Sequence, residues 1–246
     1  MGYRCIIWGY WAVQCCACLP ARVPPVQFTI YSLNPSPDTG STLSRRLSVA
    51  DTTWEQYLGQ NIAFSSRSHW QRPDTPVISN FIADALFFAA DQHLGGRVDL
   101  VLVQEWVGGR YLPRGNITRQ HIYRLFSKPI RWERRELRGD VLLKYLEEHF
   151  TGKWRGVSAN VSLRYKDKHL IDFKINGKKI DTATLFQLIT IREVFAEKKQ
   201  QNFLENISLI RTGNRLPSLV MDYCFSFSSA GLPLRLSTEK RIHEND

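Results

Sequence analysis

Residues 157–175 read VSANVSLRYKDKHLIDFKI. The runs 157–165 and 170–175 are rich in β-branched and aromatic residues, and the polar pair at 167–168 separates them. Apolar and polar residues alternate in both runs, which is typical of strands with one buried face, so the stretch predicts a β-hairpin. Residues 219–227 alternate in the same way and predict another strand. Together these segments indicate a small, mainly antiparallel sheet.

Other segments repeat apolar residues at helical spacing. Residues 76–93 do so most clearly, with Thr75 suited to cap the helix and Pro76 to its first position. Residues 98–103 form a short apolar run and predict a buried strand. The remaining predicted helices are 117–126, 131–150, 182–203 and one that starts at Thr52. The chain therefore predicts an α+β fold, with helices packed on the sheet and a loosely ordered N-terminal segment.

The composition changes twice along the chain and predicts three parts. Residues 1–50 are an apolar N-terminal segment followed by a Pro/Ser-rich linker, residues 51–109 a small helix-strand unit, and residues 110–246 a basic α+β body with a charged tail from 235. The last two parts together are also compatible with one domain of ordinary size. The sequence has no apolar run long enough for a membrane-spanning helix, no heptad repeat and no collagen repeat.

The first twenty residues hold four of the five cysteines. They are compatible with a signal peptide, a lipid anchor, a metal site built from those cysteines, or a plain apolar segment, and in the first two cases they imply membrane contact. The body contains only Cys224, so it lacks the cysteine pairs of a disulfide-stapled extracellular domain. We therefore expect an intracellular protein, cytoplasmic or nuclear, unless the N-terminal segment directs the chain elsewhere.

The positive charge is concentrated in the second part of the chain. The formal net charge is +10, and all eleven lysines lie at or beyond Lys128. Read as a helix, residues 131–138 place four arginines at i, i+3, i+4 and i+7, on one side, with two more cations upstream. Arginine forks match phosphate oxygens, and an aromatic ring in such a strip can stack on an unpaired base. The predicted binding residues are Arg124, Lys128, Arg131, Trp132, Arg134, Arg135 and Arg138.

This arginine-lined helix face makes the leading hypothesis a non-enzymatic, nucleic-acid-binding accessory or regulatory protein, for either DNA or RNA. An acidic protein or a membrane surface would also suit the strip, and a plain solvated face paired internally by Glu133 and Glu136 is the alternative without a ligand.

The enzyme alternative is a Mg²⁺-dependent nuclease. Asp172-Phe-Lys174 supplies a D-x-K pattern on the second hairpin strand, where the carboxylate would bind the metal and the ammonium would hold the attacking water. Residues 161–163, which should face Asp172, include no carboxylate, so the metal site is incomplete. We expect no cofactor and no resident metal unless this alternative holds. The sequence shows no phosphate-binding glycine loop and no recognisable Ser/His/Asp or Cys/His arrangement.

Overall fold

The computed structural model describes residues 40–73, 75–94, 96, 98–103, 108–126, 130–150, 155–193, 207–213 and 215–245. Predictions for residues 1–20 and for Lys128 lie outside these ranges. The chain divides into two compact units, Met1–Arg46 and Leu47–Asp246. Of the first unit only the beginning of helix α1 (Gly40–Gly59) is described. None of the described helices has the length and apolar character that a membrane span requires.

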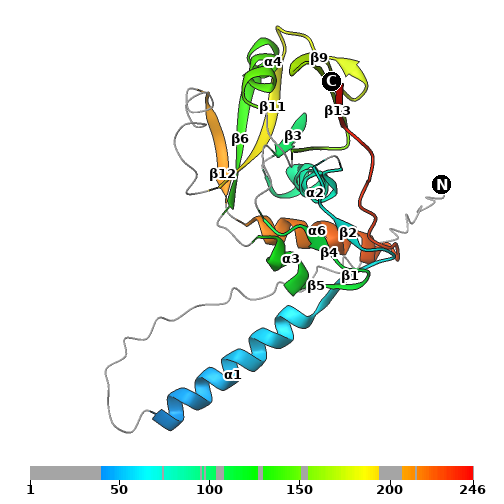
Figure 1. Cartoon of the computed structure of the whole chain (residues 1–246). Helices are drawn as coiled ribbons and strands as arrows, with labels where there is room; N and C mark the ends of the chain where they lie inside the picture. Colours follow the sequence, from blue (N-terminus) through cyan, green and yellow to red (C-terminus); the bar gives the residue numbers. More distant parts are fainter. Residues whose placement is uncertain are drawn as a thin grey trace, which may run out of the picture. The chain divides into compact units, whose positions relative to one another are not determined.

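A mixed five-stranded sheet lies at the centre of the second unit (Figure 1). Its strands follow the order β12 (Leu209–Gly213), β6 (Ile130–Arg138), β11 (Leu185–Glu193), β3 (Leu100–Val103) and β7 (Gly156–Val157). Strand β11 pairs antiparallel with all nine residues of β6 and parallel with β3.

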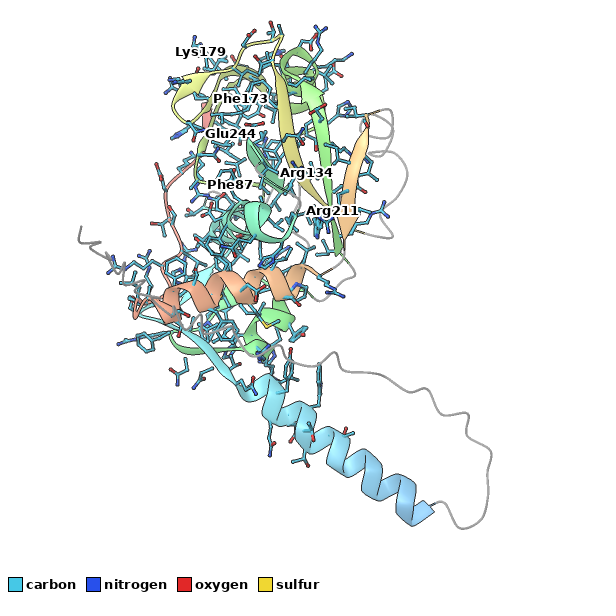
Figure 2. All side chains as sticks on the ribbon, turned by 180° about the vertical axis from the view of Figure 1, so that it is seen from behind. Phe87, Arg134, Phe173, Lys179, Arg211 and Glu244 are labelled. Carbon is cyan, nitrogen blue, oxygen red and sulfur yellow. The ribbon has the colours of Figure 1, made fainter. Side chains whose placement is uncertain are left out.

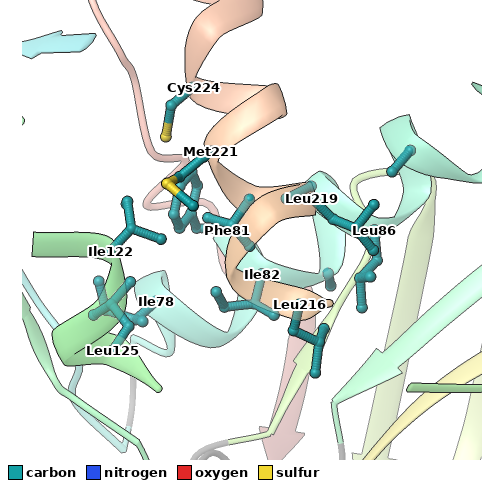
Figure 3. Close-up of a cluster of buried hydrophobic side chains, with 14 of the residues drawn as sticks. Ile78, Phe81, Ile82, Leu86, Ile122, Leu125, Leu216, Leu219, Met221 and Cys224 are labelled. Atoms are coloured by element: carbon teal, nitrogen blue, oxygen red, sulfur yellow. The ribbon is translucent and has the colours of Figure 1, made fainter. Parts of the chain in front are cut away.

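The middle strands β6, β11 and β3 are buried on both faces, and their alternate residues enter different cores, whereas the edge strand β12 is largely exposed. In β3, Val101 and Val103 face a core formed with helices α2 (Val77–His93), α3 (Arg119–Leu125) and α6 (Leu216–Ser229). Leu100 and Leu102 face a second core, formed with helix α4 (Gly139–Glu148) and the other large sheet. Burial on both faces explains why the strand reads as a continuous apolar run. Figure 3 shows the first core, where side chains of α2, α3 and α6 meet.

Helix α2 contributes the largest share of the first core. It begins beside Gln71, whose Oε1 accepts hydrogen bonds from the backbone nitrogens of Ile78 at 2.7 Å and Ser79 at 3.2 Å. These two amides would otherwise lack partners at the helix start. The side chains of Phe81, Ile82 and Leu86 are almost fully buried. Figure 1 shows α2 beside both β3 and α6.

The second large sheet has four strands in the order β10 (Lys178–Lys179), β9 (His169–Ile175), β8 (Val161–Lys166) and β13 (Ile242–Asn245). Strands β8 and β9 form a hairpin, and its turn residues Asp167 and Lys168 have positive φ angles of 49° and 67°. Strand β13 pairs parallel with β8.

Two short antiparallel ladders complete the fold. One joins β1 (Asn61–Ser65) to β5 (Gly115–Thr118), and the other joins β2 (His69–Trp70) to β4 (Tyr111–Leu112). In both ladders a strand that precedes Gly109 therefore pairs with a strand that follows it.

The α+β class is confirmed, with five helices among the described residues and sheets that are mixed. The predicted helix at 76–93, the strand at 98–103 and the hairpin around 167–168 are also confirmed. Two predicted helix positions are wrong. Residues 130–138 form β6 and only 139–148 are helical, while 185–193 of the predicted helix 182–203 form β11.

Three further predictions are corrected. Residues 216–229 form helix α6 rather than a strand, because Leu216, Leu219, Val220 and Cys224 share a helical stripe that is buried against α2 and α3. The helix expected to start at Thr52 begins twelve residues earlier, at Gly40, and is α1. The charged tail expected from 235 is packed against the body, since Arg241 is buried and β13 joins the four-stranded sheet.

Candidate functional site

Two adjoining hollows lie around the turn that joins β7 to β8. The aromatic hollow has a volume of about 490 Å³ and is lined by Asp84, Phe87, Phe88, Gln92, Ala159 and Tyr223. The polar hollow has a volume of about 340 Å³ and is lined by Ala159, Asn160, Val161, Ser162, Asn176, Gly177, Glu239, Lys240, Arg241 and His243. Ala159 lines both, so the two hollows are neighbours.

Helix α2 forms one wall of the aromatic hollow. Phe87 and Phe88 follow Asp84 by three and four residues, and Gln92 follows Phe88 by four, a spacing that places them on one side of a helix. Helix α6 supplies Tyr223, whose ring centroid lies 5.3 Å from that of Phe88. Burial raises the pKa of Tyr223 to about 12, so its hydroxyl stays protonated at neutral pH. The hollow therefore combines aromatic rings with an amide and a carboxylate.

Asp84 holds three parts of the chain together. Its Oδ1 accepts hydrogen bonds from the backbone nitrogen of Ala159 and from Arg241 Nη1, and its Oδ2 accepts one from Arg241 Nη2, each at 2.8 Å. Arg241 Nη1 also donates to the carbonyl oxygen of Val157 at 2.7 Å. Burial raises the pKa of Asp84, and the bonds to Arg241 and Ala159 act in the opposite direction. This network fixes the turn that separates the two hollows.

The polar hollow is built from two turns and the C-terminal segment. Asn160 Nδ2 donates to the carbonyl oxygen of Asp99 at 2.7 Å, and the Asn160 carbonyl accepts from the backbone nitrogen of Asn176 at 2.7 Å. Asn176 and Gly177 both have positive φ angles, 53° and 75°, as a tight hairpin turn requires. The Asn160 side chain and the backbone of the turn at 176–177 thus fix two walls of this hollow.

The predicted arginine face does not exist as a helix face, because β6 is a strand. Alternation sends Arg134 toward the first core and Arg135 toward the second, and both are buried. Arg134 donates to Gln187 Oε1 at 3.2 Å and to the Leu94 carbonyl at 3.1 Å. Figure 2 labels Arg134 on β6 and Arg211 on the neighbouring strand β12.

Glu133 pairs with two of these arginines on one face of the strand. Its Oε2 lies 2.8 Å from Arg135 Nη2, and its Oε1 lies 3.0 Å from Arg131 Nε. Arg138 Nη2 lies 2.7 Å from Asp140 Oδ2, and this contact holds the pKa of the Asp140 carboxyl below its usual value. Arg131, Arg135 and Arg138 therefore each form an ion pair with a carboxylate of the same chain.

The other predicted binding residues do not join these arginines in a shared surface. The Trp132 side chain is buried in the first core, where it cannot stack on a base. Arg124 is exposed in the last turn of α3, and Lys128 lies outside the described residues. The predicted residues therefore do not form a single binding surface.

The nuclease pattern also lacks its second carboxylate in the structure. The residue opposite Asp172 on β8 is Arg164, and Asp172 Oδ2 lies 3.2 Å from Lys174 Nζ. No group of three or more His, Cys, Asp or Glu side chains suited to a metal occurs among the described residues.

Sequence reasoning missed the residues that do converge. The sequence feature that could have indicated this site is Asp84, a carboxylate within the largely apolar helix segment 77–93. A buried carboxylate needs a partner, but the partner is Arg241, 157 residues further along the chain.

No family model and no curated protein matches this chain. Several solved structures share its fold. A 5′-nucleotidase precursor from Thermus thermophilus matches with a TM-score of 0.61 and 14% identity, covering 84% of this chain and 43% of that one. A sulfate thiohydrolase from Thermus thermophilus has a TM-score of 0.60 and 13% identity, covering 83% and 38%. The NAD nucleotidase of Haemophilus influenzae has a TM-score of 0.58 and 12% identity, covering 84% and 42%.

The chain thus spans less than half the length of each of these proteins. Their fold contradicts the function predicted from the charge pattern. The neighbours are nucleotidases and a sulfate thiohydrolase, so the prediction of a non-enzymatic nucleic-acid-binding protein is wrong, and so is the nuclease alternative. Burial of Arg134 and Arg135 explains why the charge pattern misled.

Proposed function

We propose that this chain is a nucleotidase-type hydrolase domain whose own contribution is to bind the nucleoside part of the substrate. The observation that carries the proposal is the fold, which nucleotidases share over more than four fifths of this chain. Because the match covers less than half of each of these proteins, the chain would act as one domain of such an enzyme.

The aromatic hollow offers the contacts that a nucleobase needs. Its volume lies within the usual range for small-molecule sites, about 300–1,000 Å³. Phe87, Phe88 and Tyr223 present ring surface on which a base can stack, and each such stack contributes about 1–3 kcal/mol. The Gln92 amide can both donate and accept, so it suits a base edge that carries both kinds of group.

The sugar has a natural partner in Asp84. An ionised carboxylate offers about four acceptor positions, and Asp84 uses three of them for Ala159 and Arg241. Oδ2 accepts only one of these bonds, so a ribose hydroxyl can donate to the same oxygen. A nucleoside would thus be held by aromatic stacking and by a carboxylate that the fold has already positioned.

Calorimetric titration of the full chain with adenosine and with AMP tests the proposal. We expect both to bind, and Phe88→Ala to weaken both by about tenfold because one stacking surface is lost. Phe64→Ala is the matched control, since Phe64 is an exposed phenylalanine of β1 outside either hollow. Absence of binding at millimolar ligand, or equal binding by wild type and Phe88→Ala, would contradict the proposal.

A further inference from the structure

The outer face of the four-stranded sheet is strongly basic. On β8 and β9, alternate residues such as Leu163 and Phe173 point into the second core, so the residues between them point outward. The strand registers place Arg164 beside His243 and place both Ser162 and Lys179 opposite Lys174. This basic face consists of Ser162, Arg164, Lys166, Asp172, Lys174, Lys179 and His243.

Cations outnumber carboxylates on the basic face. Its carboxylate, Asp172, is paired with Lys174. Arg164, Lys166 and Lys179 leave the face with a positive field that attracts anions toward its edge. Figure 2 labels Lys179 on this sheet.

The polar hollow borders the basic face, because Ser162 and His243 belong to both. Lys240 adds an exposed ammonium to the lining, and Glu239 is the carboxylate that lines it. Within the described residues, neither Lys240 nor His243 forms an ion pair with a carboxylate. Both side chains therefore remain available to an anion that enters the hollow.

Arg241 forms the inner wall of the polar hollow, and 4% of its side chain is exposed. Its two terminal nitrogens bind Asp84 and Val157, so its position is fixed. Its Nε is buried and has no hydrogen-bond partner among the described residues. A buried N–H without a partner is costly, and an oxygen anion held against this wall would offset part of that cost.

We propose that the polar hollow is a phosphate site, and that it binds the phosphate of a nucleotide whose base occupies the aromatic hollow. Lys240, His243 and Ser162 supply the donors, and the basic face draws the anion in. Ala159 lies between the two hollows, so one ligand can extend from stacking rings to cations. The assignment of the anion to a nucleotide rests on the proposed function, but the affinity for phosphate does not.

The test compares inorganic phosphate, adenosine and AMP as ligands of the full chain by calorimetry. We expect wild type to bind phosphate and to bind AMP more tightly than adenosine. The double variant Lys240→Gln with His243→Gln should lose about tenfold in affinity for phosphate and AMP, because two donors are removed, and should keep its affinity for adenosine. Lys144→Gln, at an exposed position of α4 outside both hollows, should bind all three as wild type does.

Failure of the two proposals can be told apart. Adenosine binding without phosphate binding, or equal phosphate affinity in wild type and the double variant, would overturn the phosphate site and leave the nucleoside site standing. Phosphate binding that the double variant weakens, without any adenosine binding, would support the phosphate site and overturn the nucleoside site. Circular dichroism of the double variant checks that it is folded, and Lys240→Gln alone repeats the measurement if it is not.

Discussion

Replacing Asp84 with alanine removes the acceptor of three hydrogen bonds and leaves the Arg241 guanidinium without its counter-charge. Both partners are largely out of water, with 16% of the Asp84 side chain and 4% of the Arg241 side chain exposed. Breaking one side of a buried ion pair costs about 3–5 kcal/mol, because the remaining charge stays desolvated. The partial exposure of Asp84 places the expected loss near the lower limit, at about 3 kcal/mol.

Urea unfolding followed by tryptophan fluorescence measures this loss. With an m-value of about 3 kcal/mol per molar urea for a domain of this size, the midpoint should fall by about 1 M. Asp140→Ala is the matched control, since Asp140 also binds an arginine, at 2.7 Å, but on the surface. Exposed pairs contribute little to stability, so its midpoint should move much less.

A double-mutant cycle then separates the pair from its surroundings. Asp84→Ala combined with Arg241→Met removes both charges, so the double variant should be more stable than Asp84→Ala alone. Strictly additive losses, or a loss below about 1 kcal/mol for Asp84→Ala, would refute the assignment of a coupled buried pair. Asp84→Asn keeps the volume and one acceptor, and it serves in the cycle if the alanine variant does not fold.

Three further outcomes follow from buried groups. Burial, and to a smaller extent the charge of Arg67, lowers the pKa of His69. As the pH falls, the histidine is therefore protonated in the unfolded chain before it is protonated in the folded one. The melting temperature should fall as the pH drops below about 6.5, and His69→Gln should flatten this dependence. Burial raises the pKa of the Cys224 thiol to about 12, so mass mapping after iodoacetamide at pH 8 should find it unmodified when folded and modified in urea. Gly156→Ala should destabilise strongly because its Cβ would meet the Ser79 backbone, whereas Gly59→Ala has open space, and equal melting temperatures would contradict this packing.

The parts of the fold that the sequence predicted correctly are those in which local pattern and tertiary environment agree. Residues 161–175 alternate because one face of the hairpin is buried, and the positive φ angles at 167–168 suit the polar turn. Helix 77–93 has apolar residues on most of its surface, and it lies between a sheet and another helix. In both segments the residue spacing reports directly on what surrounds the chain.

The prediction for residues 131–138 was wrong because their pattern is compatible with both the helical and the strand period. Arginines at i, i+3, i+4 and i+7 share a helix side, yet on a strand the same residues alternate between two faces. The pairing of Glu133 with Arg131 and Arg135 needs the strand, where residues two apart lie on one face. Strand β11 decides between the periods, because all nine residues of β6 pair with it. That partner lies more than forty residues further on, beyond the reach of local spacing.

The candidate site shows the same dependence on distant partners. The segment 239–243 is charged and reads as a solvated tail, and nothing within it indicates that Arg241 would be buried. The carboxylate that requires this arginine lies in α2, and the backbone that both bind belongs to the turn before β8. A charged residue in an apolar helix therefore predicts that a partner exists, although only the fold identifies it. A carboxylate inside an apolar helix, such as Asp84, is thus a stronger indicator of a distant partner than the run of arginines in β6.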